Sequence, residues 1–130
     1  MFTHIENFWS PDVEESARVT GEELGHPVPG YTSVTMLARR ELFTRIGTFD
    51  TSLRHGNDRD WFMRATEQGV VVEMLPEVLV RRRLHGSNRS AALGANSRAE
   101  YLRILKASLD RRRNAAGGEG DVAALPFQKS

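Results

Sequence analysis

The sequence contains no cysteine, and this absence excludes several kinds of chemistry at once. Disulfide bonds, thiolate metal sites and a cysteine nucleophile are all ruled out. The first residues, MFTHIENFW, carry polar and acidic side chains where a signal peptide would be continuously apolar. No later run approaches the length of a membrane-spanning helix. We therefore expect a cytoplasmic, soluble protein without a transmembrane segment.

The chain also lacks an excess of charge of either sign, since 18 Lys and Arg residues accompany 17 Asp and Glu residues. No overall field attracts nucleic acid, and no nucleic-acid partner is expected. With 39% hydrophobic and 27% charged residues, the 130 residues suffice for one folded domain. No Walker loop, nucleophile elbow, Rossmann glycine fingerprint or paired-histidine zinc motif is present, which argues against hydrolases, nucleotidases and dehydrogenases.

The first part of the chain predicts strands separated by a helix and a loop. Aromatic and branched side chains predict a strand over residues 2–9. The Ser-Pro pair at 10–11 resembles an N-cap followed by the first helical residue, which predicts a helix that ends at Gly21 or Gly25. Proline and glycine then predict a loop over 27–30. The next segment, 32–38, is a second candidate strand.

Two helices that end at glycine are predicted for the central part. Apolar residues on one face predict a short helix over 39–46, which Gly47 would end. A second helix should begin at Asn57 or Asp58, since either side chain can cap it, and should run to about residue 68 before Gly69.

Two strands and a longer helix are predicted for the remainder. Apolar runs predict strands over 70–75 and 78–84, separated by Pro76. Ser97 and Glu100 have the spacing of a capping box, which predicts the start of a helix. The apolar stripe of this helix would comprise four residues: Tyr101, Leu102, Leu105 and Leu109.

Alternating strands and helices favour an α/β fold, with a small mixed sheet and flanking helices, over an all-helical bundle. Residues 1–113 would form this domain, and residues 114–130 would be a flexible tail because they contain few apolar side chains. A sheet of three or four strands should leave an unpaired edge and exposed apolar surface. We therefore expect either self-association or a partner that covers this edge.

The densest group of polar side chains is HGNDRDWFMR, residues 55–64. A carboxylate at a helix N-terminus is stabilised in its charged form by unpaired backbone N–H groups, which would poise Asp58 to accept a proton or a metal. In the simpler alternative, Asp58 only caps the helix and Asp60 forms an i,i+4 pair with Arg64. Spacing alone favours this simpler alternative.

A second polar group, RRRLHGSNRS at 81–90, follows a predicted strand. Arginine offers paired donors to phosphate oxygens, and His85 could bind a divalent ion or donate to a departing phosphate. Alternation along the strand sends Arg81 and Arg83 to one face and Arg82 to the other, so the three arginines cannot converge.

Taken in order, PGYTSVTMLARRELFTRIGTFDTSLRHGNDRDWFMRATEQG and then MLPEVLVRRRLHGSNRS resemble the C-terminal half of family 2 glycosyltransferases. The likeness spans about residues 29–90 and depends on the order and spacing of its motifs. It implies a partial GT-A fold, similar to nucleotide-diphospho-sugar transferases. It also implies inverting transfer of a sugar from a nucleotide-sugar donor to the hydroxyl of a glycan or other acceptor.

The resemblance implies a catalytic role for Asp58, which matches the general base of that family. The carboxylate would take the proton of the acceptor hydroxyl while the oxygen attacks the anomeric carbon. The preceding position is usually Glu in the family, and Asn57 departs from that pattern. This departure puts the rate or the choice of acceptor in doubt.

Further site residues follow from the resemblance alone. Trp61 matches an aromatic position that lines the acceptor site, although core packing is an equal alternative. His85 matches a histidine near the metal and the diphosphate, and a complete enzyme of this kind can use Mg²⁺ or Mn²⁺. Three flanking positions are implied to bind substrate: Arg82, Asn88 and Ser90.

The Asp-x-Asp metal motif of the family belongs to its N-terminal, donor-binding half. No Asp-x-Asp precedes Tyr31 here, and the one such spelling, at 58–60, lies at the position of the base. We therefore expect this chain to be inactive alone and to need a donor-binding half as a partner. The alternative is a non-catalytic binding or assembly module derived from a glycosyltransferase.

Overall fold

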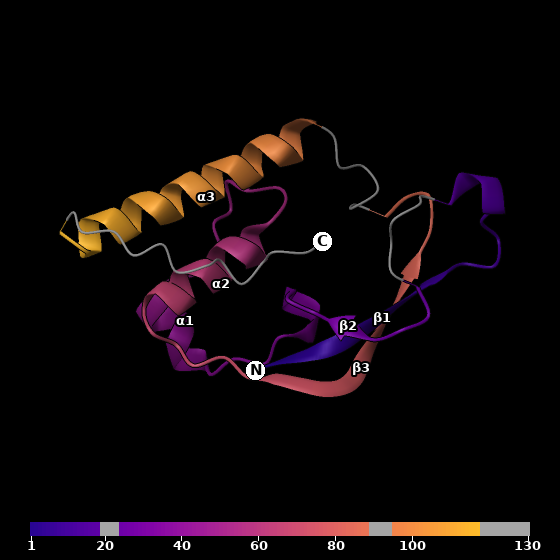
Figure 1. Cartoon of the computed structure of the whole chain (residues 1–130), viewed down its shortest axis with the longest axis horizontal. Helices are drawn as coiled ribbons and strands as arrows, with labels where there is room; N and C mark the ends of the chain where they lie inside the picture. Colours follow the sequence, from indigo (N-terminus) through magenta and orange to yellow (C-terminus); the bar gives the residue numbers. More distant parts are fainter. Residues whose placement is uncertain (19–23, 89–94, 118–130) are drawn as a thin grey trace.

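The computed structural model describes residues 1–18, 24–88 and 95–117, which form a mixed α/β arrangement (Figure 1). A small sheet lies beside α1 and α2, and α3 crosses over α2 on the side away from α1. Within these described ranges, eight elements follow one another: β1 (Phe2–Trp9), η1 (Glu15–Ala17), β2 (Val28–Pro29), η2 (Ser33–Thr35), α1 (Arg40–Ile46), α2 (Asn57–Glu67), β3 (Met74–Leu84) and α3 (Ala95–Ala115).

The sheet has three strands in the order β2-β1-β3, with β1 antiparallel to β2 and parallel to β3. The expected α/β class with a small mixed sheet is thus confirmed, as is the strand over residues 2–9. The strand predicted over 78–84 is confirmed as part of β3, whereas the separate strand over 70–75 is wrong, because one strand runs from Met74 through Pro76 to Leu84. The register shifts on either side of His4 let the proline lie in an edge strand, where its missing N–H costs no ladder bond.

The helix predicted after β1 is wrong within residues 10–18, where the chain forms turns and the short 3₁₀ helix η1. The Ser10 hydroxyl donates to the Asp12 carboxylate and does not cap a helix. The backbone N–H of Ser10 donates to Leu84 O at 2.9 Å, which ties this turn to the end of β3. A contact distant in sequence therefore overrides the local helix signal.

The strand predicted over 32–38 is also wrong. Thr32 uses its hydroxyl to accept the N–H of Val34 at 3.2 Å, which starts η2. The loop predicted over 27–30 instead contains β2, whose two residues pair with His4 and Ile5 on β1. The segment 32–38 does not join the described sheet, although just before β1 Leu37 and Met1 exchange two backbone hydrogen bonds of 2.9 and 3.1 Å.

The two central helices agree with prediction. α1 ends at Gly47, which takes φ +94° and donates its N–H to Phe43 O at 3.1 Å. α2 ends just before Gly69, and the Asp60–Arg64 pair forms with 2.9 Å between Nε and the carboxylate.

Aromatic side chains join α2 to the rest of the core. Phe62 meets Phe2 of β1 edge to face, with ring centroids 5.1 Å apart, and Tyr31 lies 5.5 Å from both rings. On another side of α2, Trp61 stacks on Phe43 of α1. The start of β1, α1 and α2 therefore form one packed unit.

α3 packs on α2 with a different face from the one that its leucines predict. Leu102 is 59% exposed, whereas Ile104 is 3% exposed and Ser108 is buried beside it. Glu67 at the end of α2 joins the two helices, since its carboxylate accepts hydrogen bonds from the Ser108 hydroxyl and from Arg111 Nε at 2.6 Å. Of the predicted apolar stripe, Leu105 packs against the buried cluster around Ile104, whereas Leu102 and Leu109 face outward.

The predicted capping box is wrong as well, because α3 begins at Ala95 and Ser97 lies inside it. The Glu100 carboxylate instead reaches the loop before α2. α3 continues to Ala115, and residues 118–130 of the expected tail lie outside the described residues. None of the helices described here is long and apolar enough to cross a membrane.

Candidate functional site

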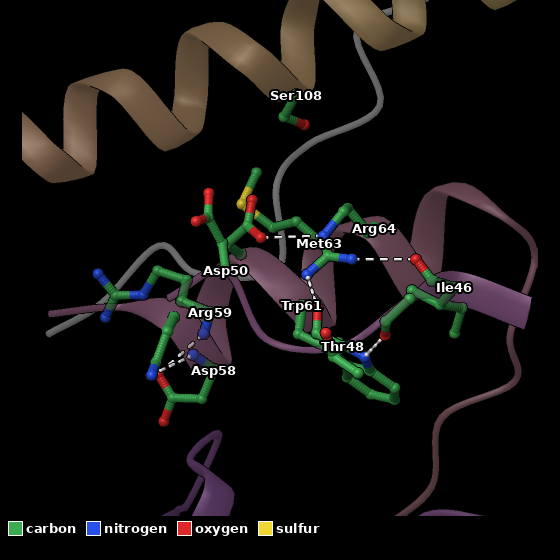
Figure 2. Close-up of polar contacts among 12 residues, drawn as sticks. Ile46, Thr48, Asp50, Asp58, Arg59, Trp61, Met63, Arg64 and Ser108 are labelled. Atoms are coloured by element: carbon green, nitrogen blue, oxygen red, sulfur yellow. Dashed lines mark hydrogen bonds and ion pairs between the residues drawn. The ribbon is translucent and has the colours of Figure 1, made fainter. Parts of the chain in front are cut away.

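Asp58 lies in the first turn of α2, at the junction with η2. One carboxylate oxygen accepts the N–H of Ser33 at 3.1 Å. The other accepts the N–H of Arg59 at 2.9 Å (Figure 2). The N-cap residue is Gly56, one position before the predicted caps, while Asn57 accepts the N–H of Asp58 at 2.8 Å. Asp58 is half-buried, so its carboxylate is held by two amides and still reaches the surface.

Asp60, two residues further on, has a structural role. Its carboxylate pairs with Arg64. Arg64 also donates to Ile46 O at 3.0 Å and Thr48 O at 2.8 Å (Figure 2). These bonds tie the middle of α2 to the turn after α1. Asp60 is buried and has its charge partner, so it is not available to a substrate.

Trp61 belongs to the core. The indole is 2% exposed, and its Nε1–H donates to Gly47 O at 2.8 Å. Its ring stacks on Phe43 with centroids 4.7 Å apart and planes inclined by 26°. The indole thus packs in the core, as the second alternative predicted, and it also lines the cavity described below. The acceptor-stacking role predicted from the resemblance stays a prediction.

The loop after β3 holds His85 through a local network. Asn88 closes this loop, because its Oδ1 accepts the N–H of His85 and its Nδ2 donates to Arg83 O at 3.3 Å. The His85 ring nitrogen Nδ1 lies 2.9 Å from the Ser87 hydroxyl. The amide of Asn88, predicted to bind substrate, is thus engaged with backbone groups.

The arginines of β3 are also engaged. Arg81 pairs with Glu6 at 3.2 Å and lies 5.0 Å over the ring of Phe8, both on β1. Arg82 is half-buried on the neighbouring position of β3. Ser90, the remaining predicted substrate-binding residue, lies outside the described residues.

Asp12 is a polar residue near His85 that the sequence patterns did not indicate. The pKa of Asp12 is lowered, first by the Ser10 hydroxyl, then by its own backbone N–H, and further by the positive charges of Arg83 and His85. Asp12 follows β1 and His85 follows β3, and the carboxyl ends of these parallel strands lie at one edge of the sheet. The Ser-x-Asp spacing directly after a strand was the signal that could have revealed this cluster.

The structure does not bring Asp58 and His85 together. Asp58 lies on α2 beside η2, whereas His85 follows the far end of β3, and Figure 1 shows these two places well apart. Between the described atoms of these two residues there is no hydrogen bond or ion pair. Among the residues that the structure describes, no three His, Asp or Glu side chains form a group that could hold a metal ion.

A cavity of about 700 Å³ opens between α1, α2, the start of β1 and the segment 69–73. Its lining is mostly apolar and includes Leu37, which is 70% exposed, and Val71, which is 85% exposed. Arg39 and Arg45 also line it, but Asp58 and His85 do not. Trp61 and Phe62 of the polar group at 55–64 therefore line the cavity, whereas no residue of the group at 81–90 does.

Comparison with known proteins gave no match: no family model, no curated protein and no solved structure is significantly similar to this chain.

Proposed function

We propose that this chain is the acceptor-side part of an inverting GT-A glycosyltransferase similar to family 2, with Asp58 as the general base. The observation that carries the proposal is the half-buried Asp58 carboxylate, oriented by the N–H groups of Ser33 and Arg59 at the start of α2. The ordered likeness over residues 29–90 and the mixed α/β fold also support it.

In the proposed reaction, Asp58 takes the proton of an acceptor hydroxyl while the oxygen forms a bond to the anomeric carbon. The bond from that carbon to the diphosphate breaks, the nucleoside diphosphate leaves with the electron pair, and the configuration is inverted. The donor would be bound by a donor-binding half. The described residues do not fit Mg²⁺ or Mn²⁺, because no three of their carboxylates and imidazoles converge, and no step is assigned to a metal.

The test measures sugar transfer by this chain, alone and joined to a GT-A donor-binding half, with a panel of nucleotide sugars. Asp58→Asn should lower the rate by about 100-fold or more, because it removes the base while keeping the size of the side chain. Asp110→Asn is the matched control, since the Asp110 side chain is about half exposed on α3 and, within the described residues, its ion pair is with Lys106 on the same helix. Transfer that survives Asp58→Asn unchanged would refute the assignment.

A second candidate is a non-catalytic binding or assembly module. The apolar cavity with exposed Leu37 and Val71 favours it, as does the separation of Asp58 from His85. The same assay discriminates the two functions. A module of this kind would give no transfer with any donor-binding half, and Asp58→Asn would change nothing.

A further inference from the structure

α3 reaches back to the loop that precedes Asp58. The Glu100 carboxylate accepts two consecutive backbone N–H groups, that of Arg54 at 3.1 Å on Oε1 and that of His55 at 2.8 Å on Oε2. Each oxygen thus holds one amide, 46 and 45 residues away in sequence. Charge-assisted bonds of this kind orient their partners more strongly than neutral ones.

The residue after this pair, Gly56, is held by the same helix. Gly56 takes φ +73° as the N-cap of α2, and a Cβ on it would lie 3.1 Å from Cδ1 of Ile104. Ile104 is buried in a cluster with Leu53 and Met63, so it has little freedom to move aside. α3 therefore fixes both the hydrogen bonds and the space at the start of α2.

α3 also contacts the residue that follows Asp58. The guanidinium of Arg59 lies 5.0 Å from the ring centroid of Tyr101, which is next to Glu100. A further contact joins Arg103 to the Ser52 hydroxyl at 3.3 Å. Both flanks of Asp58 are thus in contact with one turn of α3.

We propose that Glu100 is the positioning residue of Asp58: by holding the amides of Arg54 and His55 it sets where α2 begins, and so keeps the Asp58 carboxylate against Ser33. The role in catalysis depends on the proposed function, whereas the effect on the Asp58 carboxylate does not. If Glu100 only fastened α3 to the domain, its loss would weaken packing and leave the Asp58 hydrogen bonds in place.

The test is backbone amide NMR on the ¹⁵N-labelled chain. The amides of Arg54 and His55 report on Glu100, and those of Ser33 and Arg59 report on the Asp58 carboxylate. In Glu100→Ala we expect hydrogen exchange at the first pair to rise about tenfold, the factor for one lost bond of ordinary strength. We also expect the amide resonances of the second pair to move.

Glu100→Gln is the conservative variant, which keeps one accepting oxygen and should give smaller changes at the same four amides. If Glu100→Ala does not fold, Glu100→Gln provides the test on its own. Asp110→Asn on the same helix is the control and should move none of them. The proposal would be overturned if exchange changed at Arg54 and His55 while the amide resonances of Ser33 and Arg59 stayed in place. It would also be overturned if the exchange rates of Arg54 and His55 did not change.

The transfer assay gives the second readout. Glu100→Gln should lower kcat more than it raises KM, because the acceptor still binds while the base is less well placed. A KM effect alone would refute the positioning role in catalysis. If no transfer occurs even with the unaltered chain, the proposed function fails, whereas the NMR experiment still decides whether Glu100 orients Asp58.

Discussion

Two carboxylates of α2, only two residues apart, have different environments. A separation of two residues on a helix turns the side chains by about 200°, so Asp58 and Asp60 point to different sides. Asp60 turns inward to Arg64, and Asp58 meets the N–H of Ser33 near the surface. The Asp-x-Asp spelling therefore does not provide two carboxylates to one ligand here.

The buried indole of Trp61 allows a prediction at the scale of the residue. Trp61→Ala should lower the free energy of unfolding by about 3–5 kcal/mol, because a large core ring is removed and a cavity remains. Trp61→Phe should cost about 1–2 kcal/mol, since it keeps the stack on Phe43 but loses the hydrogen bond to Gly47 O.

Urea denaturation followed by circular dichroism measures both values. The acceptor-lining alternative makes the opposite prediction. Under it, Trp61→Ala would keep nearly full stability and lose affinity for the sugar acceptor, and such a result would contradict the core assignment.

At the scale of the element, β3 is an edge strand that resists pairing with another chain. Among the strands that the structure describes, β1 alone lies beside it, and the register skips Pro76 and Glu77, and then Leu79, along this strand. Proline has no N–H to offer a new neighbour, and bulges break the regular ladder that a second strand needs. The self-association predicted from an unpaired edge therefore meets a specific obstacle at Pro76.

Removal of this obstacle should promote association. We expect Pro76→Thr to shift the chain toward larger species at equal concentration, because it restores a donor on an edge that also carries Leu79, which is 68% exposed. Sedimentation velocity at increasing concentration measures the effect. Pro27→Thr, at an exposed position before β2, is the control and should sediment like the unaltered chain. Equal sedimentation of all three would contradict the protective role of Pro76.

At the scale of the whole molecule, three carboxylates accept hydrogen bonds that favour their charged form. Asp12 and Asp50 do so within their own turns, and Glu100 does so between α3 and the loop before α2. The pKa of Asp12 is lowered chiefly by the Ser10 hydroxyl, that of Asp50 by Ser52, and that of Glu100 by the N–H groups of Arg54 and His55. Their usual values are 3.8 for Asp and 4.5 for Glu. All three lie at the surface, so each contribution to stability is modest.

The sign of the pH dependence follows from these lowered pKa values. Because the folded pKa lies below the unfolded one, the unfolded chain binds more protons as the pH falls. The stabilisation is present in full above the usual value of 4.5 for Glu and is lost progressively below it. We expect a Tm that is level from neutral pH to about pH 5 and then falls toward pH 3.

Thermal unfolding across this range checks the expectation. Glu100→Gln should show a lower Tm at neutral pH and a shallower decline in acid, because it has no proton to gain. Asp110→Asn should follow the unaltered chain. An equally steep acid decline in Glu100→Gln would show that Glu100 contributes nothing to the pH dependence.

The sequence by itself determined the elements whose signals are local. The strand over residues 2–9 and the helices that end at Gly47 and Gly69 depend on side-chain alternation, helical periodicity and a glycine stop, all within one segment. The placement of Asp58 in the first turn of a helix was predictable for the same reason.

Only the tertiary structure decided which partners these elements meet. The Ser10 amide bonds to Leu84 O, Glu100 holds the amides of Arg54 and His55, and Asp58 accepts from Ser33. These partners are separated by 25 to 74 residues, so no local pattern contains them. The parallel pairing of β1 with β3 likewise carries His85 to the far end of the sheet, because strand direction is set by long-range pairing and not by the residues of either strand.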